Sequence, residues 1–398
     1  MSPLNIACYY PWIYLSSGVE RTIVEVAMRS RHRWTIYTNH LSPEATYQEF
    51  SKLKVVELDR VSVNRGYLHV GEAALKIFRQ RIPMHQHDVL LVHSEGAGDF
   101  VTFRNHSKPV VCYCHTPLKV INDPWARRQY LRRNPGKAPL LWLCGTVFQF
   151  MDRLAWRKYS RVLANSESVR ERIARARLAP AENVEVLNPG VDCTLLTPTW
   201  TYEKYFLLLA RLKWWKNVEL AIEGFRAFRR MCSGGSEFTL VVAGQVDEGS
   251  RKYYSELQNL AASCQGISFV PNPSAEKIRS LYRSCYAVLN TTLNEDWGIV
   301  PLEANAYGKP VIAVNQGGPL ESQVHGKTGY LVPPEPAAFA AAMASLAEDE
   351  RLVRTMGEQA RLHVSKYDWS NFVARIDEVL EEVARKALRG SSTSDPGV

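Results

Sequence analysis

The chain has 398 residues, of which 46% are hydrophobic and 22% are charged. At about 150 residues per domain this length suggests two or three domains, and the apolar content excludes a mostly disordered chain. The longest apolar stretch, residues 138–151, is shorter than the roughly 20 residues that a membrane-spanning helix needs. We therefore do not expect an integral membrane protein. The first residues have no basic segment followed by a long apolar one, which argues against secretion.

The net charge of +9 is concentrated in the first half of the chain. Residues 1–198 hold 27 Lys and Arg against 17 Asp and Glu, a balance of +10, whereas residues 199–398 hold 22 against 23, a balance of −1. In residues 124–161, nine basic residues and one acid alternate with Trp, Tyr and Phe. This mixture suits an anionic membrane surface or a lipid-linked anionic ligand, a nucleic-acid strand, or a solvated helical face above a core stripe. Because no nucleic-acid motif accompanies it, we expect no nucleic-acid partner.

The eight cysteines are scattered along the chain. No pair with zinc-ligand spacing is backed by a second pair. We interpret the cysteines as reduced thiols of a cytosolic protein and expect no metal site among them.

Short apolar runs alternate with amphipathic helical patterns from one end of the chain to the other. In the first half we expect strands over residues 5–9, 34–38, 89–93, 109–113 and 161–165, with helices such as 19–28 and 167–176. In the second half we expect strands over 205–210, 238–243, 267–270, 287–290 and 310–314, with helices including 217–230, 251–262, 299–306 and 336–347. Continuous apolar strands that alternate with helices are typical of parallel sheets covered on both faces.

A Thr- and Pro-rich break near residues 192–202 divides these elements into two sets. We predict an α/β protein with one Rossmann-like domain over 1–195 and another over 196–368. The helical pattern from 369 to 389 could belong to either domain, and residues 390–398 have the composition of a disordered tail. Ligands of such folds bind beyond the carboxyl ends of the strands, so we expect the site there.

Two features of the first half stand at expected strand ends. Gly18 lies in the turn after the first strand and just before a helix, where glycine allows close backbone approach and the helix start attracts anions. His115 follows the strand expected to end at residue 113. Each feature taken alone is also compatible with an ordinary turn or an incidental loop histidine.

Two cations follow the first strand of the second half. Arg211 and Lys216 stand between that strand and the next expected helix. Arginine binds a pyrophosphate with two hydrogen bonds and lysine supplies a point charge. Without further context, two solvated loop cations explain the same residues.

The stretch from residue 294 to residue 304 carries the most chemistry. Glu295 lies in the expected loop and Glu303 about one turn into the helix, eight residues further on. The backbone N–H groups of Gly298, Ile299 and Val300 are helix-start donors without an intrahelical partner. Carboxylates bind sugar hydroxyls and helix-start amides bind phosphate. A nucleotide-sugar, which has a sugar diol, a pyrophosphate and a ribose diol, satisfies all of these groups.

At these residues the sequence resembles glycosyltransferase family 4, whose members have the GT-B fold, two Rossmann-like domains facing across a cleft. The E-x7-E spacing, the phosphate-binding Arg/Lys pair, the first-domain histidine and the glycine loop of that family match Glu295 and Glu303, Arg211 and Lys216, His115, and residues 17–20. The likeness extends from Ile6 to about Glu381. Residues 295–321 look most similar to mannosyltransferases that use GDP-mannose.

The resemblance implies that the second domain binds the nucleotide-sugar and the first domain the acceptor. Glu303 would hold the ribose hydroxyls and Glu295 the sugar hydroxyls, while Arg211 and Lys216 would neutralise the departing diphosphate. His115 would contact the donor sugar. The implied catalytic set is His115, Arg211, Lys216 and Glu295, and the implied donor-binding set is Gly18, Trp297, Gly298, Ile299, Val300 and Glu303.

The activity so implied is retaining hexosyl transfer, with mannose from GDP-mannose as the favoured donor. The acceptor would be a glycan or a lipid-linked glycan of cell-surface polysaccharide or glycoconjugate synthesis. The family needs neither a metal nor a cofactor, and no Asp-x-Asp motif stands at an expected strand end. The enzyme would be cytoplasmic, or peripheral at the inner face of the membrane through residues 124–161. A UDP-sugar transferase with a soluble acceptor, a sugar-nucleotide epimerase and a non-catalytic nucleotide-sugar binding protein remain open at this point.

Overall fold

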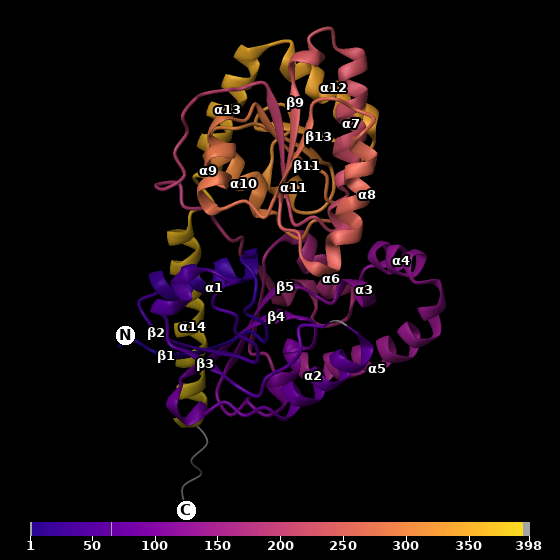
Figure 1. The fold of residues 1–398 in the computed structure, drawn as a ribbon. Helices are drawn as coiled ribbons and strands as arrows, with labels where there is room; N and C mark the ends of the chain where they lie inside the picture. Colours follow the sequence, from indigo (N-terminus) through magenta and orange to yellow (C-terminus); the bar gives the residue numbers. More distant parts are fainter. Residues whose placement is uncertain (1, 65, 393–398) are drawn as a thin grey trace, which may run out of the picture. The chain divides into compact units, whose positions relative to one another are not determined.

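The computed structural model describes residues 2–64 and 66–392. The chain divides into two compact units, one formed by Met1–Pro189 with Trp369–Val398 and the other by Gly190–Asp368 (Figure 1). The first part of unit one ends six residues before the predicted boundary at 195. The final helix, α14 (Trp369–Ser392), belongs to unit one. It includes residues 390–392 of the predicted disordered tail, and the rest of that tail lies outside the described residues.

Unit one is built on a parallel sheet whose strands, within the described residues, run in the order β3-β2-β1-β4-β5-β6-β7. The strands are β1 (Asn5–Tyr9), β2 (Arg33–Thr38), β3 (Val55–Glu57), β4 (Val89–Glu95), β5 (Val110–Thr116), β6 (Arg161–Ala164) and β7 (Val184–Val186). The central strands β1, β4 and β5 are buried along nearly their whole length. Helices on both faces explain this burial and the continuous apolar runs of these strands.

The helices of unit one connect these strands and cover the sheet. They are α1 (Gly18–Arg29), α2 (Tyr67–Arg79), α3 (Lys119–Asn122), α4 (Pro124–Arg133), α5 (Ala138–Trp156), α6 (Glu167–Arg175) and α14, with 3-10 turns η1 (Gln48–Lys52), η2 (Met84–Gln86), η3 (Gly96–Phe103), η4 (Pro135–Lys137) and η5 (Ala181–Asn183). Polar contacts attach α14 to this unit. Arg375 Nε lies 2.7 Å from Glu185 Oε1, and Ser30 Oγ donates to Asp377 Oδ1 at 2.5 Å.

Unit two has a second parallel sheet in the order β10-β9-β8-β11-β12-β13. Its strands are β8 (Tyr205–Leu209), β9 (Thr239–Gly244), β10 (Ile267–Pro271), β11 (Ala287–Asn290), β12 (Val311–Val314) and β13 (Gly329–Val332). Its helices are α7 (Val218–Met231), α8 (Arg251–Ala261), α9 (Ala275–Ser284), α10 (Ile299–Ala306), α11 (Pro319–Ser322), α12 (Pro336–Ala347) and α13 (Glu350–Val364), with 3-10 turns η6 (Trp214–Lys216), η7 (Gly235–Glu237) and η8 (Glu248–Ser250). In Figure 1, α7, α8 and α12 lie on one side of this sheet and α9 and α10 on the other.

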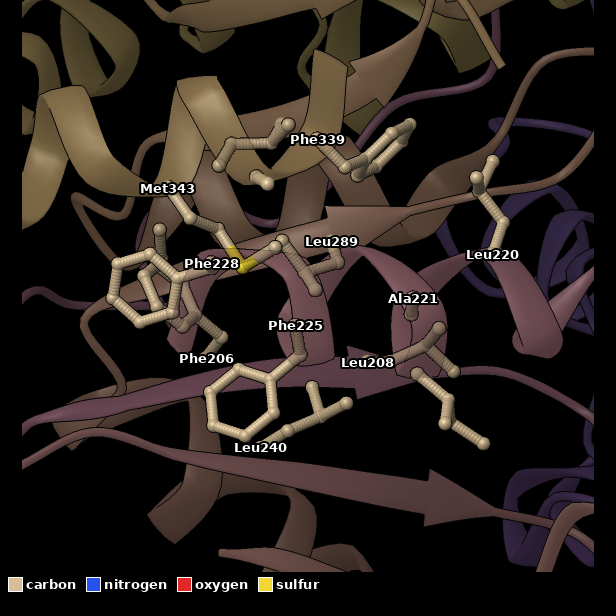
Figure 2. Close-up of a cluster of buried hydrophobic side chains, with 14 of the residues drawn as sticks. Phe206, Leu208, Leu220, Ala221, Phe225, Phe228, Leu240, Leu289, Phe339 and Met343 are labelled. Atoms are coloured by element: carbon tan, nitrogen blue, oxygen red, sulfur yellow. The ribbon is translucent and has the colours of Figure 1, made fainter. Parts of the chain in front are cut away.

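An aromatic core joins α7 and α12 to the second sheet (Figure 2). Phe206, Phe225 and Phe228 are fully buried, and each side chain of this size contributes about 1.5–3 kcal/mol when it leaves water. A Cβ added to Gly224 would lie 2.9 Å from Cβ of Phe339, so α7 and α12 approach closely at that glycine. The packing holds β8 and the loop that follows it in place.

The prediction of two Rossmann-like domains is confirmed. Each predicted strand is present with ends shifted by three residues or fewer, and the structure adds β3, β7 and β13. Both sheets also have a point where the strand order reverses, between β1 and β4 in unit one and between β8 and β11 in unit two. Ligands of doubly wound sheets bind beyond the strand ends at such points.

Candidate functional site

The reversal point of the second sheet brings two predicted site segments to one edge. β8 and β11 are neighbours with Ala287 opposite Phe206. The loop after β8 carries Arg211 and Lys216, and the loop after β11 carries Glu295. Both loops leave the carboxyl ends of their strands, so parallel pairing places them together.

Lys216 and Glu295 form an ion pair at this edge. Lys216 Nζ lies 2.6 Å from Glu295 Oε2, and the two side chains are 18% and 13% exposed. Thr291 Oγ1 donates to the backbone oxygen of Lys216 at 2.9 Å, which ties the two loops together. The structure thus unites the residues predicted to meet the diphosphate and the sugar. Arg211 is exposed on the same loop, and no ion pair joins it to another residue of the described chain.

Two glycines support the loop that carries Glu295. Gly317 has φ +68°, and a Cβ there would lie 2.3 Å from the backbone oxygen of Glu295. A Cβ at Gly318 would lie 2.2 Å from the backbone oxygen of Trp297. The N–H of Gly318 donates to the oxygen of Glu295 at 2.9 Å. Any side chain at these two positions would push the loop away.

The start of α10 is open to an anion. Gly298 is the N-cap residue with φ +84° and, as a glycine, makes no side-chain cap bond. The first-turn amides of Ile299 and Val300 have no intrahelical acceptor, and the helix dipole adds positive potential at this end. The side chain of Trp297 is buried in a cluster with Leu302 and other apolar residues, so it anchors the loop and only its backbone faces the helix start.

Glu303 is held by a buried tyrosine that sequence reasoning missed. Tyr282 of α9 donates its hydroxyl to Glu303 Oε2 at 2.9 Å and stacks on Tyr307 with ring centroids 5.3 Å apart. Burial, and then the nearby Glu303 carboxylate, raise the pKa of Tyr282 well above its ordinary value. The hydroxyl therefore stays protonated and fixes one carboxylate oxygen. Nothing in the spacing of the sequence indicates this contact.

In unit one, Gly18 opens the helix that follows β1. Ser17 is the N-cap residue of α1, but its hydroxyl bonds to Glu20 instead of capping the helix. A Cβ at Gly18 would meet nothing within 4 Å. Packing within the described chain therefore does not require glycine here, and the open space leaves room for a ligand at the helix start.

His115 lies inside β5 and not in a loop, which corrects the prediction that the strand ends at residue 113. The strand extends because its pairing with β4 resumes at Thr116 after a shift between Ser94 and Glu95, with His115 as the inserted residue. Its ring is 7% exposed and its Nε2 lies 2.9 Å from Nδ1 of His93. Gly18 follows β1, and His115 lies near the carboxyl end of β5. Because β1 and β5 are parallel strands of one sheet, both residues lie at the same edge of that sheet.

Residues 124–161 include α4, η4 and α5, and Arg161 is the first residue of β6. The side chain of Asp123 caps α4 by accepting from the amides of Trp125 and Ala126. One face of α5 is buried, whereas another exposes large apolar side chains, namely Leu140, Trp142, Leu143, Val147 and Phe150. Helices of the described chain are each too short or too polar to span a bilayer.

Two family models match consecutive parts of the chain. "Glycosyltransferase Family 4" matches residues 16–195, and "Glycosyl transferases group 1" matches residues 199–363. The two matches meet near the break between the two sets of elements and together include every predicted site residue.

Curated relatives extend along almost the whole chain. The alpha-1,3/1,6-mannosyltransferase ALG2 of Homo sapiens is 30% identical over 379 residues, which cover 88% of this chain and 89% of the relative. The protein of the same name from Dictyostelium discoideum is 28% identical over 420 residues and covers 96% and 98%. A D-inositol 3-phosphate glycosyltransferase of Arthrobacter is 25% identical over 326 residues and covers 77% and 73%.

Solved structures share the fold at low identity. Anabaena Alr3699/HepE in complex with UDP and glucose matches with a TM-score of 0.73 at 20% identity and covers 95% of this chain and 99% of that one. Sucrose-phosphate synthase of Thermosynechococcus elongatus matches with a TM-score of 0.74 at 16% identity and covers 96% and 99%. The solved structures show the GT-B class of fold. The relatives and the family models show that the chain belongs to glycosyltransferase family 4 and is a hexosyltransferase.

Proposed function

We propose that this enzyme transfers mannose from GDP-mannose to a lipid-linked glycan and retains the anomeric configuration. The names of the ALG2 relatives support mannose as the transferred sugar. The observation that carries the proposal is the edge between β8 and β11, where the Lys216–Glu295 ion pair lies in the loops beside the uncapped start of α10.

The chemistry requires that negative charge on the departing diphosphate be stabilised. Lys216 and Arg211 supply cations, and the amides of Ile299 and Val300 supply donors, so each is assigned to the diphosphate. Glu295 positions Lys216 in the resting enzyme and receives the sugar hydroxyls when the donor binds. Because these groups are fixed before the reaction, little reorganisation is needed as the charge develops.

Glu303 is assigned to the ribose hydroxyls. Tyr282 holds one of its oxygens, which orients the carboxylate toward a diol. In unit one, His115 is assigned to the donor sugar, and the open turn at Gly18 to the donor or acceptor that approaches it. The acceptor oxygen bonds to the anomeric carbon as the bond to the diphosphate breaks, and its proton leaves with the diphosphate. The assignment includes no metal and no cofactor.

A transfer assay with a panel of donors tests the proposal. Purified enzyme is incubated with a lipid-linked glycan that ends in mannose and with GDP-mannose, UDP-glucose, UDP-galactose or UDP-N-acetylglucosamine. We expect product with GDP-mannose and an α-linkage by NMR. Product with a UDP-sugar alone would discard mannose but keep the fold and the reaction class. Interconversion of the donor without transfer would support an epimerase.

We further propose that residues 124–161 dock unit one on the anionic cytoplasmic face of a membrane, where a lipid-linked acceptor is found. Two observations support this placement. Trp142 and Phe150 are 73% and 62% exposed on α5. Basic residues flank them, namely Arg127, Arg128, Arg132, Arg133, Lys137, Arg153, Arg157 and Lys158. An apolar face bordered by cations is typical of helices that lie in the membrane interface.

Vesicle sedimentation tests the docking. We expect binding to vesicles that contain phosphatidylserine, weaker binding to neutral vesicles, and loss of binding in the double variant Trp142→Ser/Phe150→Ser. Leu362→Ser is a matched control, because Leu362 is 71% exposed on α13 of unit two. Equal binding to both vesicle types, or equal loss in the control, would overturn the docking proposal.

A further inference from the structure

A second histidine, His93, lies directly behind His115. It is 1% exposed near the end of β4 and belongs to none of the motifs that the sequence offers. The two rings are nearly parallel, with an interplanar angle of 20° and centroids 5.2 Å apart. His93 Nδ1 lies 2.9 Å from His115 Nε2, a hydrogen-bond distance.

The pairing of β4 with β5 becomes irregular next to this contact. Ser94 pairs with Cys114 and Glu95 with Thr116, so His115 is the inserted residue. Such a bulge bends its strand and redirects a side chain, and it is rare between parallel strands. The backbone oxygen of His115 accepts from Asn165 Nδ2 at 3.0 Å, which stabilises the bulge. The two rings therefore meet beside an irregular step in the sheet, near the ends of two neighbouring strands.

The hydrogen bond between the rings contains one hydrogen, which belongs to one ring or the other. Burial, and then the neighbouring His115, lower the pKa of His93 well below its ordinary value, so His93 is neutral and carries a single N–H. Its other nitrogen, Nε2, is buried and has no hydrogen-bond partner in the described chain.

The unpartnered Nε2 of His93 decides which of the two rings donates the hydrogen. If His115 were the donor, the hydrogen of His93 would sit on Nε2 as a buried N–H without an acceptor. If His93 is the donor, Nε2 is only a lone pair. Buried N–H groups without a partner are rarer in proteins than under-satisfied acceptors. The second arrangement is therefore favoured, and it leaves a lone pair on His115 Nε2.

We propose that His93 is a positioning residue that donates from Nδ1 to His115 Nε2 and so fixes His115 as the tautomer with its hydrogen on Nδ1. His115 then presents an N–H donor, and not a basic nitrogen, at its Nδ1 side. It would hold a sugar or phosphate oxygen but would not remove a proton from the acceptor. The role of the ring in transfer rests on the proposed function, whereas its tautomer does not.

Long-range ¹H–¹⁵N NMR of histidine-labelled enzyme reads the tautomer without substrate. We expect wild-type His115 to show the Nδ1–H pattern and His93→Leu to shift it toward Nε2–H, the form that free neutral imidazole favours. His93→Asn, whose amide nitrogen lies near the position of Nδ1, should keep the wild-type pattern. A wild-type His115 in the Nε2–H form, or one unchanged in His93→Leu, would overturn the proposal. If His93→Leu does not fold, the wild type and His93→Asn still decide.

The transfer assay supplies the second readout. By comparison with partners that orient metal-bound imidazoles, His93→Leu should lower kcat roughly 10–100-fold, and His93→Asn should recover part of the loss. His87→Leu is the matched control. His87 is buried in the same unit and bonds to Tyr37 at 2.9 Å, away from β5. If His87→Leu lowers kcat as much as His93→Leu, the effect is loss of stability and not of positioning. If no transfer occurs in any variant but the tautomer is as expected, only the proposed function fails.

Discussion

Both sheets reverse their strand order in the middle, yet their edges at these points carry different kinds of group. In unit two the groups are charged, and two of them form the Lys216–Glu295 ion pair. In unit one they are two stacked imidazoles, His93 and His115, at the end of buried strands. The same topology therefore holds a charged pair beside the strand ends of one unit and a hydrogen-bonded pair of imidazoles near the strand ends of the other.

Unit one also contains a buried carboxyl that has no ion pair within the described residues. Asp99 of η3 is fully buried beside Ser94 and Tyr159, whose hydroxyls donate to it, and no cation pairs with it in the described chain. Burial, which outweighs these hydrogen bonds, raises its pKa to about 6. Unit one thus buries a carboxyl with a raised pKa and no cationic partner in the part of the chain described, whereas the partly buried Glu295 of unit two is paired with Lys216.

The largest effect should follow from removing Lys216, a cation at the β8–β11 edge of unit two. Lys216→Ala should lower kcat/KM about 10²–10³-fold, because it removes a fixed charge from the leaving diphosphate. We expect a similar loss for Arg211→Ala. Steady-state kinetics with GDP-mannose measure both. Lys204→Ala is the control, since Lys204 forms an exposed pair with Glu237 in the same unit. Losses below tenfold would remove Lys216 from its assigned role.

The next effect concerns the buried Asp99 of unit one. Folding raises the pKa of Asp99 above its ordinary value of 3.8, so the folded state prefers the protonated acid, and this group destabilises the fold as pH rises from about 4 to about 6. Each pKa unit is worth about 1.4 kcal/mol, so the free energy of unfolding of Asp99→Asn relative to wild type should rise by roughly 2–3 kcal/mol over that range. Urea titrations at pH 4, 5, 6 and 7 measure this difference. A difference independent of pH would contradict a raised pKa.

A third prediction separates two reasons for a glycine, namely close contact with neighbouring backbone and a left-handed conformation. Gly317 and Gly326 both have positive φ, but only Gly317 has backbone within 4 Å of an added Cβ. Gly326→Ala should cost about 1 kcal/mol of stability for the left-handed conformation. Gly317→Ala should cost about 2 kcal/mol more, because the loop of Glu295 must move, and it should also weaken donor binding. Equal losses in urea unfolding would mean that the glycine does not support the loop.

The smallest effect should come from the tyrosine behind Glu303. Tyr282→Phe removes a hydrogen bond to a carboxylate, and a loss of about 1.4 kcal/mol would weaken donor binding tenfold. Tyr286→Phe removes a comparable buried bond to Leu346 in the same unit and should leave donor affinity unchanged. Calorimetric titration with GDP compares the two. Parallel losses would assign Tyr282 to stability alone.

Most strands could be predicted from the sequence, and the strands that were not predicted share a physical cause. The strands that were missed, β3, β7 and β13, are three or four residues long and lie at sheet edges. Edge strands are exposed on one side, so residues such as Glu57 and Glu185 interrupt the apolar runs that reveal central strands. A short run with a charge in it does not stand out from a loop.

The residues of the candidate site also differ in whether local sequence indicates them. Glu295, Glu303 and Lys216 could be picked out from the sequence because charges at fixed spacing stand out beside apolar strands. His93 sits in the apolar run of β4, and its contact with His115 depends on how β4 pairs with β5, which no local pattern encodes. Tyr282 reaches Glu303 from another helix. Contacts that depend on register or on packing between elements need the three-dimensional structure.

Thermal unfolding in the presence of nucleotides tests most directly the claim that unit two binds the donor at the β8–β11 edge. A ligand at 100 times its Kd stabilises a fold by about 2.7 kcal/mol. GDP and GDP-mannose should raise the unfolding temperature of the wild type and of the control Glu237→Ala, but not of Glu303→Ala. A rise that persists in Glu303→Ala, or no rise with GDP, UDP, ADP, dTDP or their sugar conjugates, would contradict the account.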